Sequence, residues 1–260
     1  GARPVRPTAS RALSGPFGLA VRLQRGTLVA WGLGLFAGGL ALGSVGGDVE
    51  DLLGDSDTAR DVFAQGGGDV TLAFLATFLF LLALLAAAFT VQSALRPAGE
   101  EAAGGAEAVL ANPVSRSRWL GAHLAVTAGC STALLLAAGL GTAASYAVVS
   151  GDSAQLTRLV GGALSYLPAL WLLGAVAGAL YGVVPRAWPV AWGVFAGCVG
   201  MGILGRLLEL PQWLRNVSPF EHVPRLPQAE WRPAPLAALV GASVIVAALG
   251  VAGLRRPDLR

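Results

Sequence analysis

The sequence predicts an all-α protein that crosses a membrane with six helices. Six uncharged apolar runs lie at 28–46, 70–91, 120–149, 159–184, 188–205 and 234–254. Only 13% of the chain is charged, where roughly a quarter is usual in a soluble domain. A bilayer core takes about 20 apolar residues per helix, and hydrocarbon leaves each backbone amide to be bonded within its own segment. The loops are too short to bury a core, so we expect one transmembrane domain over residues 1–260.

Small residues in these runs indicate how the spans pack. Glycines four residues apart let helices approach closely, which is the main attraction available between helices in lipid. Some of these glycines would face a second subunit. The pairs and ladders are Gly34/Gly38, Gly39/Gly43, Gly174/Gly178/Gly182 and Gly193/Gly197. Pro168 and Pro189 are expected to kink or begin the fourth and fifth helices, because proline lacks the backbone donor.

The placement of arginine predicts the orientation. All eighteen basic residues are arginine, and the first 27 residues carry five of them with no acidic residue. Alternate loops divide the arginines twelve to six in favour of the N-terminal side of the membrane. The positive-inside rule then places both termini in the cytoplasm of a bacterial cell, with residues 1–27 as a cytoplasmic segment. A nucleic-acid partner is not expected, since the arginines do not gather on one soluble face.

The chain offers little chemistry of its own. No span has an acidic or basic residue near its middle, which argues against ion-coupled transport. Without lysine there is no Walker A phosphate loop, so we expect no cofactor in this chain. Cys130 and Cys198 fall in apolar runs and are expected to pack, while Glu221 and His222 lack further metal ligands. A secondary carrier, a channel and, more remotely, a membrane enzyme or assembly factor remain alternatives.

The loop at 96–118, between the second and third runs, is the candidate functional segment. Pro97 is expected to stop the preceding helix, and Glu100 and Glu101 suit the first turn of a new one. That helix should end before Pro113, after which Ser115 caps the third span. Two glycines inside it would cost about 2 kcal/mol, so it should be ordered by docking onto something. A solvated connecting loop is the alternative.

The outer loop at 206–233, before the last run, mixes apolar, aromatic and charged residues. Such a mixture is typical of short segments that lie at the membrane interface. Arg206 and Glu209 are three apart and would pair on a helical turn. A plain surface loop is the alternative here.

Both loops resemble one family. The 96–118 loop is similar to the cytoplasmic segment of ABC-2 type exporter permeases, especially actinobacterial permeases for polyketide antibiotics and multiple drugs. The motif residues are Glu100, Glu101, Glu107, Leu110, Ala111, Pro113, Val114, Ser115, Arg116 and Arg118. The resemblance implies a type V exporter-like fold in which this segment is the coupling helix that fits a groove in the ATP-binding subunit. It assigns the coupling role to Glu100, Glu101, Glu107, Leu110, Pro113 and Arg116.

The same resemblance extends to the outer loop and to the partners. Residues 218–224 are similar to the family's re-entrant region between spans five and six, which implies that Ser218, Pro219, Phe220, Glu221 and His222 form this outer re-entrant segment. Glu221 and His222 are expected to be structural. The chain resembles one six-span half, so a second half or a like copy is expected beside it. ATP and Mg would be bound by a separate ATPase. The implied activity is export of an apolar or amphipathic, antibiotic- or drug-like compound.

Overall fold

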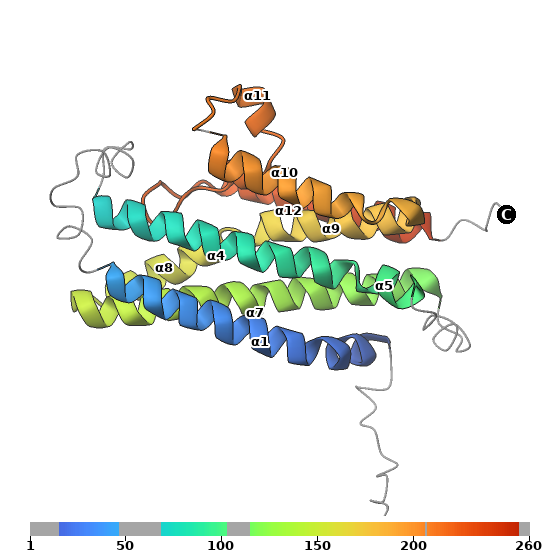
Figure 1. Cartoon of the computed structure of the whole chain (residues 1–260), viewed down its shortest axis with the longest axis horizontal. Helices are drawn as coiled ribbons and strands as arrows, with labels where there is room; N and C mark the ends of the chain where they lie inside the picture. Colours follow the sequence, from blue (N-terminus) through green and yellow to red (C-terminus); the bar gives the residue numbers. More distant parts are fainter. Residues whose placement is uncertain (1–15, 47–68, 103–114, 206, 255–260) are drawn as a thin grey trace, which may run out of the picture.

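The computed structural model describes residues 16–46, 69–102, 115–205 and 207–254, and this part of the chain contains helices and no strand. Figure 1 shows the long helices lying side by side along one axis. The start of α1, the short helix α5 and the end of α12 lie at one end of this bundle, and α8 lies toward the other. The elements are α1 (Pro16–Val45), α4 (Val70–Ala94), α5 (Arg96–Ala102), α7 (Arg116–Ser150), α8 (Ala154–Leu164), α9 (Leu167–Val183), η2 (Pro185–Ala187), α10 (Val190–Leu204), α11 (Gln212–Arg215), η3 (Pro219–His222) and α12 (Pro233–Gly253).

The all-α membrane class is confirmed by helix length and composition. Five helices in the described part are long and apolar enough to span: Ala20–Val45, Val70–Ala94, Arg116–Ser150, Ala154–Val183 and Pro233–Gly253. The fifth predicted run appears as α10, which has 15 residues. At 1.5 Å per residue it rises about 22 Å, short of a hydrocarbon core of about 30 Å. Six crossings therefore stay a prediction.

The first helix begins earlier than the sequence indicated. Residues 16–27 were expected to be a cytoplasmic segment before the span, but α1 starts at Pro16. Arg22 and Arg25 made this stretch look polar, yet both side chains are exposed while Gln24 between them is 2% exposed. A long arginine side chain carries its charge away from the helix to water, so two arginines do not end an apolar helix.

The two prolines act as predicted. The fourth span is divided into α8 and α9, and Pro168 stands in the first turn of α9. Proline cannot donate to the carbonyl four residues back, so the helix is interrupted at Ser165 and Tyr166. Pro189 likewise precedes α10, whose first helical residue is Val190.

Glycines set the closest helix contacts. A Cβ on Gly39 of α1 would lie 2.5 Å from the Ala138 carbonyl oxygen of α7, and one on Gly141 of α7 would strike the Phe36 carbonyl of α1. On the other side of the bundle, a Cβ on Gly250 of α12 would lie 2.7 Å from the Ala179 Cα of α9. Backbones this close are possible only without side chains, so the predicted use of small residues in packing holds for these pairs.

Other predicted glycines face open space. Within the described residues nothing lies within 4 Å of a Cβ built on Gly34, Gly193 or Gly197. These positions on α1 and α10 therefore take no part in packing within the described part of the chain.

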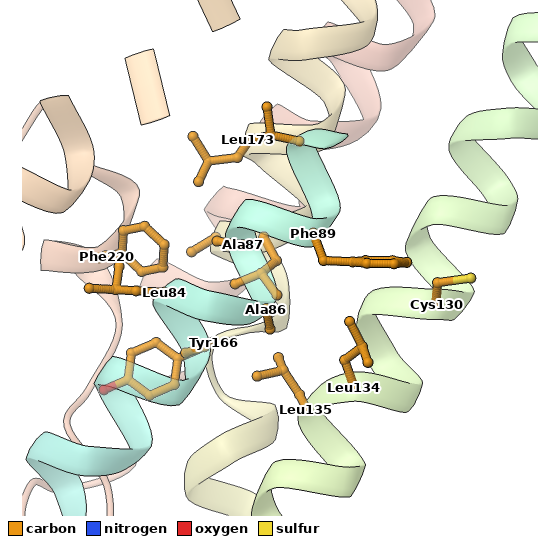
Figure 2. Close-up of a cluster of buried hydrophobic side chains, with 14 of the residues drawn as sticks. Leu84, Ala86, Ala87, Phe89, Cys130, Leu134, Leu135, Tyr166, Leu173 and Phe220 are labelled. Atoms are coloured by element: carbon orange, nitrogen blue, oxygen red, sulfur yellow. The ribbon is translucent and has the colours of Figure 1, made fainter. Parts of the chain in front are cut away.

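The core lies on α4, which is surrounded by the other long helices. Figure 2 shows Leu84 and Phe89 of α4 among Leu134 of α7 and Leu173 of α9. Phe220 of η3 joins them from the outer segment, so that segment is folded back against the bundle. Cys130 and Cys198 are both buried and unpaired, which agrees with their predicted packing role.

Candidate functional site

The candidate coupling segment starts with α5, which follows α4 after one residue. Leu95 ends α4, and the Gly99 N–H donates to its carbonyl oxygen at 3.2 Å. Pro97 was expected to stop a helix and instead stands in the first turn of α5, where a missing N–H is tolerated. Glu100 and Glu101 consequently lie beyond its first turn, so the expectation that they occupy a first turn was wrong.

The rest of the expected coupling helix lies outside the described residues. Glu107, Leu110 and Pro113 fall in the 103–114 stretch. The described chain resumes at Ser115, whose hydroxyl oxygen accepts the Arg118 N–H at 3.3 Å. The predicted N-cap of the third span is therefore confirmed.

One carboxylate fastens α5 to two long helices. The Tyr181 hydroxyl of α9 donates to Glu101 Oε2 at 2.8 Å, and Arg116 Nη2 of α7 lies 3.7 Å from Glu101 Oε1. Tyr181 is 4% exposed, whereas the Glu101 side chain is 37% exposed. The structure thus brings Glu101 and Arg116 together, as their shared assignment to the segment suggested. It adds Tyr181, which lies 80 residues away in sequence and gave no signal of this role.

An apolar contact holds the underside of α5. Ala98 packs with Trp119, Leu120 and Tyr181 in a small cluster that caps this end of the bundle. Trp119 is 5% exposed, and its ring centroid lies 5.1 Å from that of the buried His123 imidazole. Because Ala98 is buried and Gly99 and Glu100 are more open, α5 turns one face inward and leaves its acidic end accessible.

A buried polar network that the sequence did not indicate lies at the end of α4 that leads into α5. Ser93, near the end of α4, donates to Gln24 Oε1 of α1 at 2.5 Å and lies 2.7 Å from the Thr127 hydroxyl of α7. All three side chains are at most 2% exposed. Hydrogen bonds in so apolar a setting tie α1, α4 and α7 together at the base of the coupling segment. Gln24 stands between Arg22 and Arg25 in the sequence, so no local pattern marked it as buried.

The outer candidate segment forms a folded unit. Arg215 of α11 is paired with Glu221 of η3, and both side chains are largely buried. The predicted pair of Arg206 and Glu209 stays a prediction, because Arg206 lies outside the described residues. The helical turn expected for it is not seen at Glu209, which has a φ of +48° and lies outside any helix.

The five predicted outer residues lie together around η3. Ser218, Pro219 and Phe220 are buried, and His222 Nδ1 is 3.3 Å from the Ser218 carbonyl oxygen. Phe220 packs on Phe80 of α4 with ring centroids 5.9 Å apart.

A second basic residue strengthens this contact. The Arg225 guanidinium carbon lies 5.2 Å from the centre of the Phe80 ring, within the range of a cation–π interaction. In Figure 1, α11 projects from the flank of the bundle, while the buried η3 anchors the segment to it. Arg215 and Arg225 of this loop thus contact the folded segment and α4, respectively.

The described residues hold no cluster of three or more histidine, cysteine or acidic side chains suited to a metal ion. One hollow among the described residues is lined by apolar side chains and glycines. A groove of about 430 Å³ runs between α1 and α4, lined by Ala30, Trp31, Gly34, Leu35, Gly38, Leu82 and Leu85. It coincides with the open face at Gly34.

Comparison with known proteins places the chain in a family. The family model described as "Multidrug efflux system permease Rv1217c, C-terminal domain" matches residues 13–255. The multidrug efflux system permease protein Rv1217c of Mycobacterium tuberculosis (strain ATCC 25618 / H37Rv) is 41% identical over 261 residues, which cover 99% of this chain and 48% of that protein. The chain spans about half the length of this curated relative. The resemblance to ABC-2 type exporter permeases is thereby confirmed, and the chain belongs to the family of the C-terminal domain of this efflux permease.

Proposed function

We propose that this chain is one membrane-spanning half of an ATP-driven exporter, and that a separate ATPase subunit docks on α5 and the residues that follow it. The observation that carries the proposal is the attachment of α5 to α7 and α9 through Glu101. A seven-residue helix is too short to be stable alone, so its position is set by these contacts. A force applied to α5 is therefore passed to two long helices.

The composition of the chain indicates that the energy for transport comes from another subunit. The sequence contains no lysine and so lacks the residue that a Walker A loop requires. ATP and Mg would be bound by the partner, whose closure moves α5. The exporter then alternates between two packings of its helices, and the nucleotide state of the ATPase selects between them.

The second half of the exporter is proposed from the unfilled surface. The groove between α1 and α4 and the open glycines of α10 lack neighbours within the described chain. Small residues on an outer face suit close contact with another helix in lipid. The relative is about twice as long as this chain, which fits a second unit of similar size in the same polypeptide. A second copy of this chain would satisfy the same surface.

The topology completes the proposal. Both termini lie in the cytoplasm, α10 makes the fifth of six crossings, and η3 re-enters the membrane from outside. The burial of Phe220 against Phe80 supports this reading. The cargo is an apolar or amphipathic, drug-like compound moved outward, in keeping with the name of the relative as a multidrug efflux permease.

The test is co-purification of the chain with the ATPase. Alanine at both Glu107 and Leu110 is expected to lower ATPase retention and leave membrane insertion intact. The matched control is alanine at Glu209 and Leu210 in the outer segment, which should leave retention unchanged. Full retention in the first variant would overturn the coupling assignment. Transport by the chain in liposomes without any ATPase would instead favour a carrier or channel.

A further inference from the structure

A cavity of about 240 Å³, separate from the α1 groove, lies between α4, α7, α9 and α12. Leu124, Ala175, Val244 and Ala247 form part of its apolar wall. Val244 is 63% exposed, so the cavity opens sideways onto the apolar surface of the bundle. An engineered cavity of about 150 Å³ holds a benzene molecule, so this one has room for a substituted aromatic ring.

The polar side chains that line the cavity already donate their hydrogens in hydrogen bonds within the protein. The Thr90 hydroxyl donates to the Ala86 carbonyl oxygen at 2.8 Å, and the Ser243 hydroxyl to the Val240 carbonyl oxygen at 2.7 Å. The Trp171 indole N–H donates to the Ala128 carbonyl oxygen at 3.4 Å.

Thr127, the fourth polar lining residue, is committed through a neighbour. Ser93 gives its single proton to Gln24, so in the contact between Ser93 and Thr127 the threonine must be the donor. Each hydroxyl oxygen keeps lone pairs that accept further bonds. The backbone N–H groups of these helices are bonded within the helices. The cavity therefore presents acceptors and no free donor.

We propose that this cavity binds a small, neutral, apolar molecule that carries one hydroxyl or N–H donor and reaches the site from the membrane. An alkylphenol is the simplest member of this class. A molecule with only an acceptor gains no hydrogen bond here, and a charged molecule would lose its hydration against an apolar wall. The site is separate from the α5 end, and the proposal does not depend on the exported compound.

The test uses thymol and carvone, which are isomers of one molecular formula. Thymol carries a phenolic donor, and carvone carries a carbonyl acceptor. The full chain is reconstituted in lipid nanodiscs and labelled with a diazirine-bearing alkylphenol, and the labelled peptides are mapped by mass spectrometry. Labels are expected in α7, α9 and α12. At equal membrane concentration, thymol should compete about fivefold better than carvone, the effect of one neutral hydrogen bond.

Two neighbouring positions on α12 supply a matched pair of variants. Ala247→Leu fills the cavity and should abolish labelling at these peptides, whereas Ala248→Leu, which adds the same side chain outside the cavity lining, should not. Thr90→Val keeps the shape, removes an acceptor, and should reduce the preference for thymol. Monodisperse elution of each variant checks that it folds. Equal competition by carvone, or full labelling of Ala247→Leu, would overturn the proposal.

Discussion

Removing the Tyr181 hydroxyl should loosen α5 while leaving the packing around it unchanged. Tyr181→Phe keeps the ring that contacts Ala98 and Leu120, and deletes only the 2.8 Å hydrogen bond to Glu101. A hydrogen bond to a charged group contributes about 1.5–3 kcal/mol. The Glu101 side chain is 37% exposed, so water replaces part of the lost bond and the lower end, about 1.5 kcal/mol, applies.

That magnitude translates into a measurable rate. A loss of about 1.4 kcal/mol is a factor of ten in an equilibrium constant, so the α5 amides should exchange with deuterium about tenfold faster in Tyr181→Phe. Hydrogen–deuterium exchange read by mass spectrometry on the purified chain, over the peptide that contains Arg96–Ala102, measures this directly.

A second tyrosine provides the control. The Tyr166 hydroxyl is buried with no hydrogen-bond partner among the described residues, so Tyr166→Phe should leave α5 exchange unchanged and not lower stability. In a Glu101→Ala background, Tyr181→Phe should add little further effect, because the bond is already absent. Unchanged α5 exchange in Tyr181→Phe, or equal acceleration in both tyrosine variants, would refute the proposed anchoring.

Three further substitutions test other contacts. Gly39→Val should lower the free energy of unfolding of the purified chain by about 1–3 kcal/mol, because its Cβ meets the α7 backbone. Gly34→Val, whose Cβ has nothing within 4 Å, should not lower it. Equal melting temperatures of the two variants would contradict the close approach of α1 and α7. Glu221→Ala should lower the free energy of unfolding by up to about 3 kcal/mol, because it leaves Arg215 unpaired. Replacing Arg215 by Met and Glu221 by Leu together should recover most of this loss in the same melting assay. An unchanged melting temperature in the single variant would argue against the pair. Ser115→Ala should cost about 1 kcal/mol at the start of α7, visible as faster local hydrogen exchange there and nowhere else.

The sequence predicted those features that depend on neighbouring residues. Apolar runs of spanning length require helices, the missing N–H of Pro168 breaks one, and the Ser115 hydroxyl caps another. The start of α1 was misplaced because composition counts Arg22 as polar, although its long side chain points to solvent. α10 emerged shorter than its apolar run because Pro189 and the turn at Gly205 trim its ends.

The partners within each candidate site depend on the fold and could not be read from local patterns. Glu101 was recognised from a motif, but its bond to Tyr181 joins residues brought together only by the packing of α9 beside α7. Glu221 was likewise singled out from a motif, while its pairing with Arg215 depends on how the loop between α11 and η3 turns. The cavity lacks a free donor because each hydroxyl donates to a particular backbone carbonyl oxygen, and the sequence does not indicate which one.

Site-specific cross-linking from α5 tests directly whether this helix contacts the ATPase subunit on the cytoplasmic side. With Cys130 and Cys198 replaced by alanine, Glu100→Cys leaves one thiol, on the accessible end of α5. In cells that also express the ATPase, this thiol should cross-link to the ATPase subunit and stay unreactive toward an impermeant maleimide added outside. Labelling of this thiol from outside the cell, with no cross-link to the ATPase, would contradict the proposed function.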